Sequence, residues 1–456
     1  MKRAIGCGID FGTTNSSIAV AYDDGTTDVV AVASSEPREL QPSLVFLHRS
    51  GTELSGEAAI ERYLITGGRR THCTGCDLVT ADVDGRLFSE CGQFRPGGAC
   101  MDARLIAGIK SELSSTVVGS THSWARDFTF EHIVSVVLRD LKRRAERHVG
   151  ESLTHATVGR PIAFPGVGGP QGSWQDQLAE ERLIGAARAA GFEHIDVYEE
   201  PLAAIAYQPN EPGVMVSLDF GGGTFDASIV EVHADGSVEH LASQGAAIGG
   251  QDFDAALFEI AVEEALGLRD SVEIDGREVF IPAEIRTTMR TLAGVRVLLN
   301  DPQVLFTLRD RSQRGLDTSR IEAVLYAGFA YEFYRAVEEA KIELSSRPVA
   351  RIRFVRPGLV IDEQVTRSQF ERAIARQLER IAHQIDLALQ QAGKCAEEVG
   401  TVVVTGGSGQ VPAFMDLVRQ FFPDAQLRTD DTFTSVARGL AVIDAGRVDA
   451  EEALDE

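Results

Sequence analysis

The chain has 456 residues, of which 44% are hydrophobic and 25% are charged, and its formal net charge at pH 7 is -24. A chain of this length exceeds what one simple core organises, so we expect two lobes. The acidic field repels nucleic-acid backbones and anionic membrane surfaces, which excludes nonspecific binding to either.

The first residues, Met1 to Cys7, contain two basic side chains but no apolar run of signal-peptide length. No stretch of about 18 uncharged apolar residues occurs further along, so no membrane span is predicted. We therefore expect a cytoplasmic protein whose cysteines are reduced thiols.

The chain opens with an expected strand hairpin over residues 4–22. Residues 9–15 read Ile-Asp-Phe-Gly-Thr-Thr-Asn, which puts Asp10 at a strand end and follows it with Gly12, Thr13, Thr14 and Asn15. Glycine lets the backbone approach a ligand closely, and the threonines add hydroxyl groups. Strands over 27–33 and 42–47 and a helix starting at 56 are expected next.

Residues 66–100 interrupt this regular pattern, because they are rich in Gly, Arg and Cys and show no clean period. Cys73 and Cys76 form a C-x-x-C pair, with Cys91 and Cys100 further on. Four thiols could form a zinc site, but no second C-x-x-C matches the first. The alternative is incidental thiols in a surface insertion, which we favour.

Helices and strands then alternate up to the middle of the chain. Helices are predicted over 127–148 and 177–190, with strands at 156–164 and 195–198. Glu200 stands just before a short helix over 202–207. It is either a surface acid favoured by the helix dipole or an acid that helps to place Mg²⁺ or water. Two prolines and a glycine in 208–213 mark a boundary. We therefore divide the chain into a first lobe, 1–212, a second lobe, 213–446, and an acidic tail, 447–456.

The second lobe begins with a second glycine turn. Residues 219–226 read Asp-Phe-Gly-Gly-Gly-Thr-Phe-Asp, between an apolar strand and an alternating one. Gly221, Gly222 and Gly223 can point several amide groups at one spot, which suits a phosphate. Asp219 would hold a cation or water beside it, and Thr224 adds a hydroxyl. One such turn could be an ordinary hairpin, but the matched pair predicts a duplicated fold with a nucleotide between its halves.

Further glycine turns follow in the second lobe. Gly249 and Gly250 precede a helix over 255–266, and helices dominate 283–345. Strands are expected at 352–355 and 358–361, and one amphipathic helix over 368–393. Gly406, Gly407 and Ser408 follow a buried strand, at the kind of strand end where open α/β sheets bind ligands. Helices over 412–421 and 435–445 complete the expected order.

These motifs together resemble the ATPase domain of the 70-kDa heat-shock chaperone family, within the actin and sugar-kinase superfamily. The two glycine turns are similar to its phosphate motifs, residues 200–207 to its connecting helix, and residues 404–408 to its adenosine motif. Residues 338–345 and 249–254 also fit. The resemblance implies an α/β, two-lobed actin-like ATPase fold, made of duplicated ribonuclease-H-like domains that each have a mixed sheet flanked by helices.

The resemblance also implies a role for each matching residue, with ATP or ADP and Mg²⁺ as cofactors. Asp10 and Asp219 would hold Mg²⁺ through water, and Glu200 and Asp226 would order the attacking water near Thr224. The residues implied to contact the phosphates or the adenosine are Gly12, Thr13, Thr14, Asn15, Gly221, Gly222, Gly223, Thr224, Gly249, Gly250, Glu338, Lys341, Ser345, Gly406, Gly407 and Ser408.

The sequence departs from the family at three places. The family's phosphate-contacting lysine matches either Arg104 or Lys110, and we favour Lys110 because a compact ammonium suits this role. Two basic residues that sandwich adenine in the family are replaced by Ile342 and Gln410, so adenine selectivity stays open. The chain ends near the end of the ATPase domain, so we expect no peptide-binding domain or lid.

The predicted activity is slow hydrolysis of ATP, with closure of the lobes around ATP and opening around ADP. One alternative is a nucleotide-gated scaffold with little or no hydrolysis. Another is a small-molecule kinase of the same superfamily, for which no catalytic Asp is evident in the first lobe. Protein clients or co-chaperones are implied as partners by the resemblance, but the sequence does not identify them.

Overall fold

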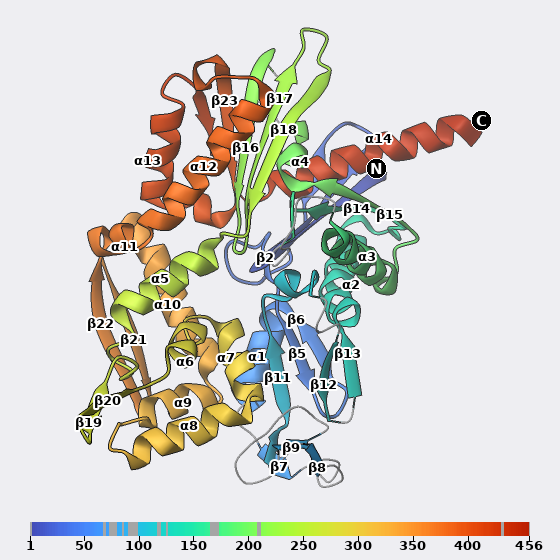
Figure 1. Cartoon of the computed structure of the whole chain (residues 1–456). Helices are drawn as coiled ribbons and strands as arrows, with labels where there is room; N and C mark the ends of the chain where they lie inside the picture. Colours follow the sequence, from blue (N-terminus) through green and yellow to red (C-terminus); the bar gives the residue numbers. More distant parts are fainter. Residues whose placement is uncertain are drawn as a thin grey trace.

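The computed structural model describes residues 2–66, 70–72, 80–83, 86–89, 99–115, 120–124, 126–164, 173–207, 211–429 and 433–455. In this part of the chain, two mixed sheets lie at the centres of two lobes, and smaller helical and hairpin regions extend each lobe (Figure 1).

The first sheet has the strand order β15-β14-β1-β2-β3, with β4 paired to β2. Its strands are β1 (Ala4–Phe11), β2 (Asn15–Tyr22), β3 (Thr27–Val29), β4 (Gln41–Pro42), β14 (His155–Arg160) and β15 (His194–Glu199). Strand β1 runs antiparallel to β2 and parallel to β14. Helices α2 (Phe130–Val149) and α3 (Trp174–Ala190) share a hydrophobic core with this sheet. Apolar residues at helical spacing on α2 explain this packing.

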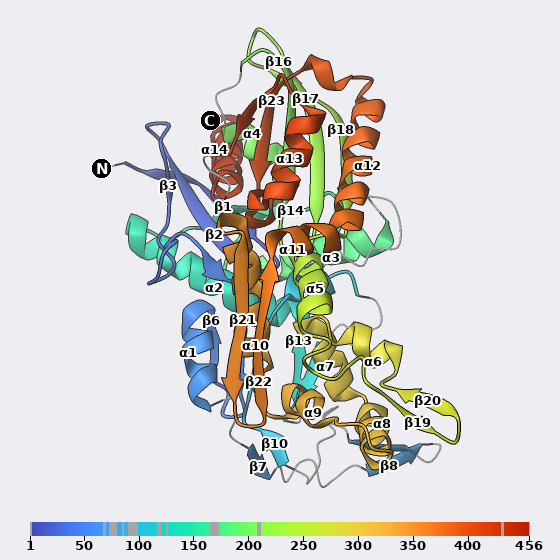
Figure 2. The same ribbon diagram turned by 90° about the vertical axis from the view of Figure 1, so that its left-hand side faces the viewer.

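The second sheet repeats the same pattern in the order β18-β17-β16-β23-β24. Its strands are β16 (Gly213–Phe220), β17 (Phe225–Val232), β18 (Val238–Ala246), β23 (Val399–Thr405) and β24 (Gln426–Arg428). Strand β16 runs antiparallel to β17 and parallel to β23, as β1 does with β2 and β14. The helices α12 (Ala375–Ala392) and α13 (Pro412–Phe421) cover one face of this sheet (Figure 2). Each glycine turn thus joins the corresponding pair of strands in its own sheet.

The outer part of the first lobe carries a small sheet and a short helix. Its elements are β5 (Val45–His48), β6 (Glu53–Ser55), α1 (Gly56–Thr66), β7 (Arg70–His72), β8 (Thr80–Val83), β9 (Arg86–Ser89), β10 (Ala99–Met101), β11 (Ala103–Ile106), the 3-10 helix η2 (Ile109–Glu112), β12 (Ser120–Ser123) and β13 (Arg126–Thr129). Strand β11 pairs with β5, and β5 pairs with β6. The small sheet therefore leads directly into η2.

The outer part of the second lobe is mainly helical, with two projecting hairpins (Figure 2). Its elements are α5 (Gly250–Ala261), β19 (Ser271–Ile274), β20 (Arg277–Phe280), α6 (Ala283–Thr288), α7 (Leu292–Asn300), α8 (Pro302–Gln313), α9 (Ser319–Tyr326), α10 (Ala330–Ser346), β21 (Val349–Arg356), β22 (Leu359–Thr366) and α11 (Arg367–Ala373). The short 3-10 helices η3 (Ala396–Glu398) and η4 (Gly407–Gln410) flank β23.

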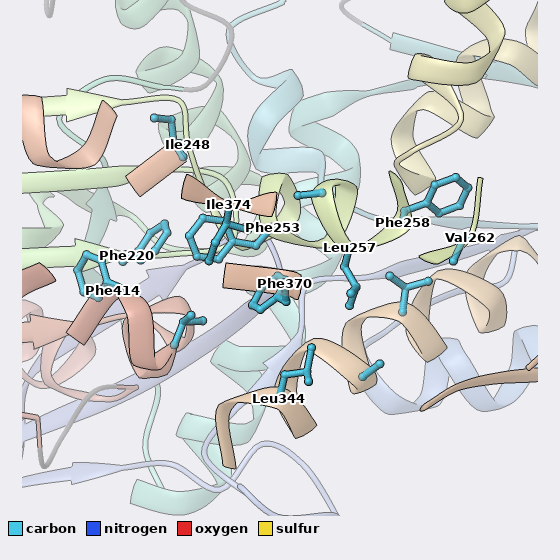
Figure 3. Close-up of a cluster of buried hydrophobic side chains, with 14 of the residues drawn as sticks. Phe220, Ile248, Phe253, Leu257, Phe258, Val262, Leu344, Phe370, Ile374 and Phe414 are labelled. Carbon is cyan, nitrogen blue, oxygen red and sulfur yellow. The ribbon is translucent and has the colours of Figure 1, made fainter. Parts of the chain in front are cut away.

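An aromatic cluster fixes the second glycine turn to the helices around it (Figure 3). The ring of Phe220, at the end of β16, lies 5.2 Å from that of Phe253 and 4.9 Å from that of Phe414, measured between centroids. Phe253 in turn contacts Phe370 on α11. Such ring pairs add about 0.5–1.5 kcal/mol each beyond the area they bury. The turn that follows Phe220 is therefore held between α5, α11 and α13.

Helix α14 (Ser435–Asp455) follows the second sheet in the chain but packs on the first sheet and on α4 (Glu200–Tyr207). A Cβ at Gly8 would lie 2.2 Å from Ala437 O, and a Cβ at Gly439 would lie 1.7 Å from Ala203 O. Glycine at these positions lets three backbones meet directly. Asp444 adds hydrogen bonds of 2.9 Å, because its carboxylate accepts from Cys7 N and Thr157 Oγ1.

Several of the expected elements have different bounds in the structure. The helix expected over 255–266 is α5, Gly250–Ala261, and the strand expected over 156–164 is β14, which ends at Arg160. The single helix expected over 368–393 is divided at Ile374 into α11 and α12. Helix α14 continues to Asp455, beyond the predicted end at 445. The boundary at residue 212 stays a proposal, and the tertiary packing of α14 on the first sheet was not evident from chain order.

The four cysteines considered for a zinc site lie largely outside the described residues. Cys73, Cys76 and Cys91 are not among them, and the structure gives only the backbone of Cys100, on β10. Of the described cysteines, Cys7 is a buried free thiol and Cys395 an exposed one. Within the same ranges, every helix is too short or too polar to cross a bilayer.

We predict that Gly439→Ala destabilises the protein strongly, by about 3 kcal/mol, because the added methyl has backbone atoms and no flexible side chain to displace. Gly446→Ala on the same helix is the matched control, since nothing lies within 4 Å of its Cβ position. The control should be neutral or stabilise by up to about 1 kcal/mol. Equal unfolding midpoints for the two variants in denaturant would contradict the packing described for α14.

Candidate functional site

The two glycine turns face each other across the gap between the lobes. A Cβ at Gly222 would lie 2.3 Å from Thr14 Oγ1, and a Cβ at Gly223 would lie 2.9 Å from Thr13 Oγ1. A side chain at Gly222 or Gly223 would therefore collide with the threonines of the first turn. The sequence predicted that the two turns form a matched pair. In the structure they lie side by side, although they are far apart in the chain.

The start of α5 and the turn after β23 complete this arrangement from the second lobe. Gly250 N and Gln251 N donate to the carbonyls of Gly221 and Gly222, at 3.0 and 2.9 Å. A Cβ at Gly249 would lie 2.3 Å from the Gly222 carbonyl. Ser408 Oγ donates to Gly221 O at 2.8 Å. The residues expected near a ligand from these two segments thus pack against the second glycine turn, and they hold its backbone in place.

Four carboxylates and one ammonium gather behind the glycine turns. Asp10 and Asp219 lie one residue before the ends of β1 and β16, Glu200 begins α4, and Asp226 lies on β17. Glu200 and Asp226 are buried, with 4% and 0% of their surface exposed. Lys110 Nζ, on η2, lies 2.6 Å from Glu200 Oε1, and Lys110 is also only 4% exposed.

The carboxylates repel one another in a dry environment. Burial, followed by the charge of Glu200, holds the pKa of Asp10 well above its ordinary value. Burial and Glu200 raise the pKa of Asp219 to about 6, although a hydrogen bond from Thr405 opposes the shift. Burial and then Asp219 hold the pKa of Asp226 well above its usual range. An added cation would relieve this repulsion.

The attraction of these acids acts in the opposite direction on Lys110. Burial lowers the pKa of its ammonium, but the charges of Glu200 and Asp10 outweigh burial, so the pKa lies above its ordinary value. Lys110 therefore stays charged inside the cluster. Arg104, the other residue considered for this position, donates from β11 to Thr121 Oγ1 at 2.8 Å. The geometry thus brings Lys110 to the acids and gives Arg104 a partner on β12.

The residues present fit a hydrated divalent cation. Asp226 Oδ2 is buried and has no hydrogen-bond partner among the described residues. The cluster contains four carboxyl groups, and Lys110 supplies only one positive charge among the residues described there. No group of three or more His, Cys, Asp or Glu in the described ranges is arranged for direct metal ligation. Mg²⁺ retains several waters when it binds proteins, so carboxylates arranged for indirect contact are compatible with it.

Helix α10 supplies the residues expected to contact a nucleoside. Lys341 Nζ lies 2.9 Å from Asp254 Oδ1 and donates to Gly250 O at 3.3 Å, so it ties α10 to α5. Glu338, Ile342 and Ser345 lie at helical spacing on one face of the same helix. Ile342 is 60% exposed.

The turn after β23 faces this helix with residues of mixed character. Gln410 is exposed, and Ser408 is buried against the second glycine turn. A Cβ at Gly407 would lie 3.0 Å from the ring of Phe433, which precedes α14. Phe433 is 36% exposed, so the described residues near this turn include an open aromatic edge.

Sequence reasoning missed several residues that hold the site. Thr405 Oγ1 donates to Asp219 at 2.8 Å, and Ile162 N donates to Asp226 at 3.2 Å. Thr405 ends β23, beside Asp219 in the parallel register with β16. A prediction that β16 and β23 pair in parallel would have placed Thr405 beside Asp219. The contact of Ile162, in contrast, depends on how the two lobes meet.

Two sheets of repeated topology, with opposed glycine turns and a buried carboxylate cluster between them, define the actin-like ATPase fold. Within that class, the family model for Hsp70 protein matches residues 6–278 and 319–452, so this chain belongs to the Hsp70 family.

Two curated relatives support the same assignment. Chaperone protein DnaK of Thermotoga neapolitana is 27% identical over 453 residues, which cover 97% of this chain and 59% of the relative. Chaperone protein DnaK 1 of a Synechococcus species is 28% identical over 461 residues, which cover 98% of this chain and 51% of the relative. The chain therefore spans between about half and three-fifths of the length of these relatives.

We predict a pH-dependent difference between the wild type and Asp219→Asn without Mg²⁺. The pKa of Asp219 rises from 3.8 to about 6 on folding, so the folded state holds this proton more tightly than the unfolded state. The associated stability is present below about pH 4 and is lost as the pH rises through 6. Asn has no such loss, so the variant should be more stable above pH 6, by on the order of 3 kcal/mol.

Denaturant unfolding of both proteins in EDTA, from pH 4 to pH 8, measures this difference. Asp424→Asn, at an exposed position, is the control and should follow the wild type. Equal stability of wild type and Asp219→Asn at pH 7.5 would show that Asp219 is not destabilised by its surroundings.

Proposed function

We propose that this chain binds ATP with Mg²⁺ between its lobes and hydrolyses it slowly to ADP and phosphate. The observation that carries the proposal is the meeting of two glycine turns beside a buried cluster of Asp10, Glu200, Asp219, Asp226 and Lys110. Family membership supports it, and the finer roles below extend it residue by residue.

The glycine turns would hold the phosphates. Backbone amides of these turns and the hydroxyls of Thr13, Thr14 and Thr224 are donors that suit phosphate oxygens, and such backbone concavities favour anions. Asp10 and Asp219 would hold Mg²⁺ through water. The ion would supply positive charge that neutralises the phosphate oxygens. Without it, the acids of the cluster would repel a triphosphate.

The buried acids would orient the attacking water. Glu200 is held by Lys110 at 2.6 Å, and Asp226 accepts from Ile162 N at 3.2 Å. Two fixed carboxylates on different lobes can accept hydrogen bonds from one water and so define its direction. Lys110, positioned by Glu200, would also donate to a phosphate oxygen. Catalysis of phosphoryl transfer consists mainly of such positioning and charge stabilisation.

Lobe closure would be the output of the nucleotide cycle. The site takes Asp10, Lys110 and Glu200 from the first lobe and Asp219 and Asp226 from the second, so a bound nucleotide contacts both lobes. Hinge closure around a ligand is a common consequence of this arrangement. A chaperone-type role, with protein clients or co-chaperones as partners in the cytoplasm, is the wider form of this proposal.

A nucleotide-gated scaffold with little hydrolysis is the second candidate. The exposed Ile342 and the exposed Gln410 favour it, because neither offers a cationic contact to a base. Binding without turnover would support this candidate. If the purified chain with Mg²⁺ neither binds nor hydrolyses ATP, both candidates fail.

We predict that Lys110→Ala lowers the rate of single-turnover ATP hydrolysis on the order of 100-fold, as expected when one preorganised donor is removed. Asp10→Asn and Thr224→Val should also lower it. Lys394→Ala is the matched control, since Lys394 forms an ion pair with Glu231 in the second lobe and away from the cluster. Radiolabelled phosphate release measures the rates, and an unchanged rate for Lys110→Ala would remove Lys110 from the proposed chemistry.

We predict that Ile342→Arg tightens ATP binding about tenfold, because a guanidinium stacked on a base contributes about 0.5–2 kcal/mol. Binding of inorganic tripolyphosphate, which has no base, should change little. Val360→Arg adds the same charge at an equally exposed apolar position on β22 and serves as the control. Calorimetry compares the ligands, and equal gains for ATP and tripolyphosphate would mean that the effect is only added charge.

A further inference from the structure

Residues 279–318 are not matched by the family model, and they form α6, α7 and α8 in the second lobe. Figure 1 shows α7 on the side of the second lobe that faces α1 and β11 of the first. This segment therefore brings residues that the family model does not describe to the edge of the gap between the lobes.

Arg296 on α7 crosses this gap. Its Nη2 donates to the carbonyl oxygen of Ala107 at 2.7 Å, between residues of different lobes. Its side chain is partly buried, and burial lowers the pKa of its guanidinium, whereas the charge of Glu112 raises it. Glu112 lies on η2, so Arg296 is drawn to this short helix by a hydrogen bond just before it and by an opposite charge within it.

The carbonyl that Arg296 contacts is close to Lys110 along the chain. Ala107 precedes Gly108, which has a φ of 65° and caps η2, and Lys110 is the second residue of η2. The backbone therefore runs from Ala107 through one residue, Gly108, into η2. A displacement of Ala107 would therefore be transmitted to the residue that pairs with Glu200.

The other end of η2 is anchored within the first lobe. Arg182 on α3 donates to the carbonyls of Leu113 and Ser115, at 2.6 and 2.8 Å. Thus one arginine from the same lobe holds the end of η2, while an arginine from the opposite lobe holds its beginning. Separation of the lobes would break the contact of Arg296, whereas the contacts of Arg182 lie within the first lobe.

We infer that Arg296 is a positioning residue for Lys110, and that it places the Lys110 ammonium correctly only while the lobes are closed. The catalytic part of this inference rests on the proposed ATPase function, whereas the structural part does not. Arg296 does not touch the expected phosphate position itself. It acts through Ala107 and η2, and so links closure of the lobes to the assembly of the carboxylate and lysine cluster.

A second contact between the lobes provides a matched control. Tyr63 on α1 donates its hydroxyl to Gly328 O at 3.0 Å. Tyr63→Phe removes this hydrogen bond between the lobes, and neither of the two residues that it joins belongs to η2. Comparison of Arg296→Ala with Tyr63→Phe therefore separates general loosening of the lobes from a specific effect on η2.

The first test uses hydrogen exchange of the full chain without nucleotide. The amides of Ser111 and Leu113 are bonded within the η2 turn. In Arg296→Ala their exchange should rise about tenfold, as expected for the loss of one charge-assisted hydrogen bond. Arg296→Lys, which keeps a charged donor, should show a smaller rise, and Tyr63→Phe should leave these amides unchanged. Unchanged exchange in Arg296→Ala, or an equal rise in Tyr63→Phe, would overturn the inference.

The second test is a double-mutant cycle on single-turnover hydrolysis. Arg296→Ala should slow hydrolysis about tenfold in the wild-type background and have no further effect in a Lys110→Ala background, because residues that act through one another are not additive. Equal slowing in both backgrounds would overturn the role of Arg296 in positioning Lys110. Failure of the wild type to hydrolyse ATP would instead overturn the proposed function, and the exchange result would still stand.

Discussion

The direct approach of the second glycine turn to the threonines of the first is the constraint on which the rest of this structure depends. The turn at Gly222 and Gly223 approaches Thr13 and Thr14 so closely that no side chain fits between them. The same approach brings acids from separate strands into one dry space, where burial and mutual repulsion raise the pKa values of Asp10, Asp219 and Asp226. The fold thus stores an electrostatic cost that a cation can relieve, which is typical of functional sites.

The elements around the site hold the strands and helices that carry its residues. Helix α14 packs by its backbone on β1 and α4, which carry Asp10 and Glu200, and Asp444 fixes the contact with hydrogen bonds to Cys7 and Thr157. In the second lobe, the aromatic cluster of Phe220, Phe253, Phe370 and Phe414 holds the other glycine turn. Each half of the site is therefore held by packing and hydrogen bonds of its own.

The two lobes meet in two ways. Near the central sheets, Ile205 of the first lobe packs in an apolar cluster with Met215, Val230 and Val403 of the second. The contacts between the outer parts of the lobes include single hydrogen bonds. Arg296 and Tyr63 each donate one hydrogen bond to a carbonyl of the opposite lobe. Hydrogen bonds of this kind contribute about 1 kcal/mol each, which is small beside the apolar cores that they connect. Loss of these two outer contacts would leave the apolar core of each lobe intact. The segment that supplies Arg296 lies outside the family match, so part of the contact between the lobes comes from residues that the family model does not cover.

The amino-acid order by itself determined the two glycine turns, the acids that flank them and the family to which they belong, because these features are local patterns of strand, turn and strand. It also favoured Lys110, although Arg104 remained an equal match by spacing. The tertiary structure alone decided that Lys110 meets Glu200, that Lys341 is paired with Asp254, and that α14 returns to the first sheet. Those outcomes depend on contacts between residues far apart in the chain, and local propensity carries no information about which distant surfaces meet.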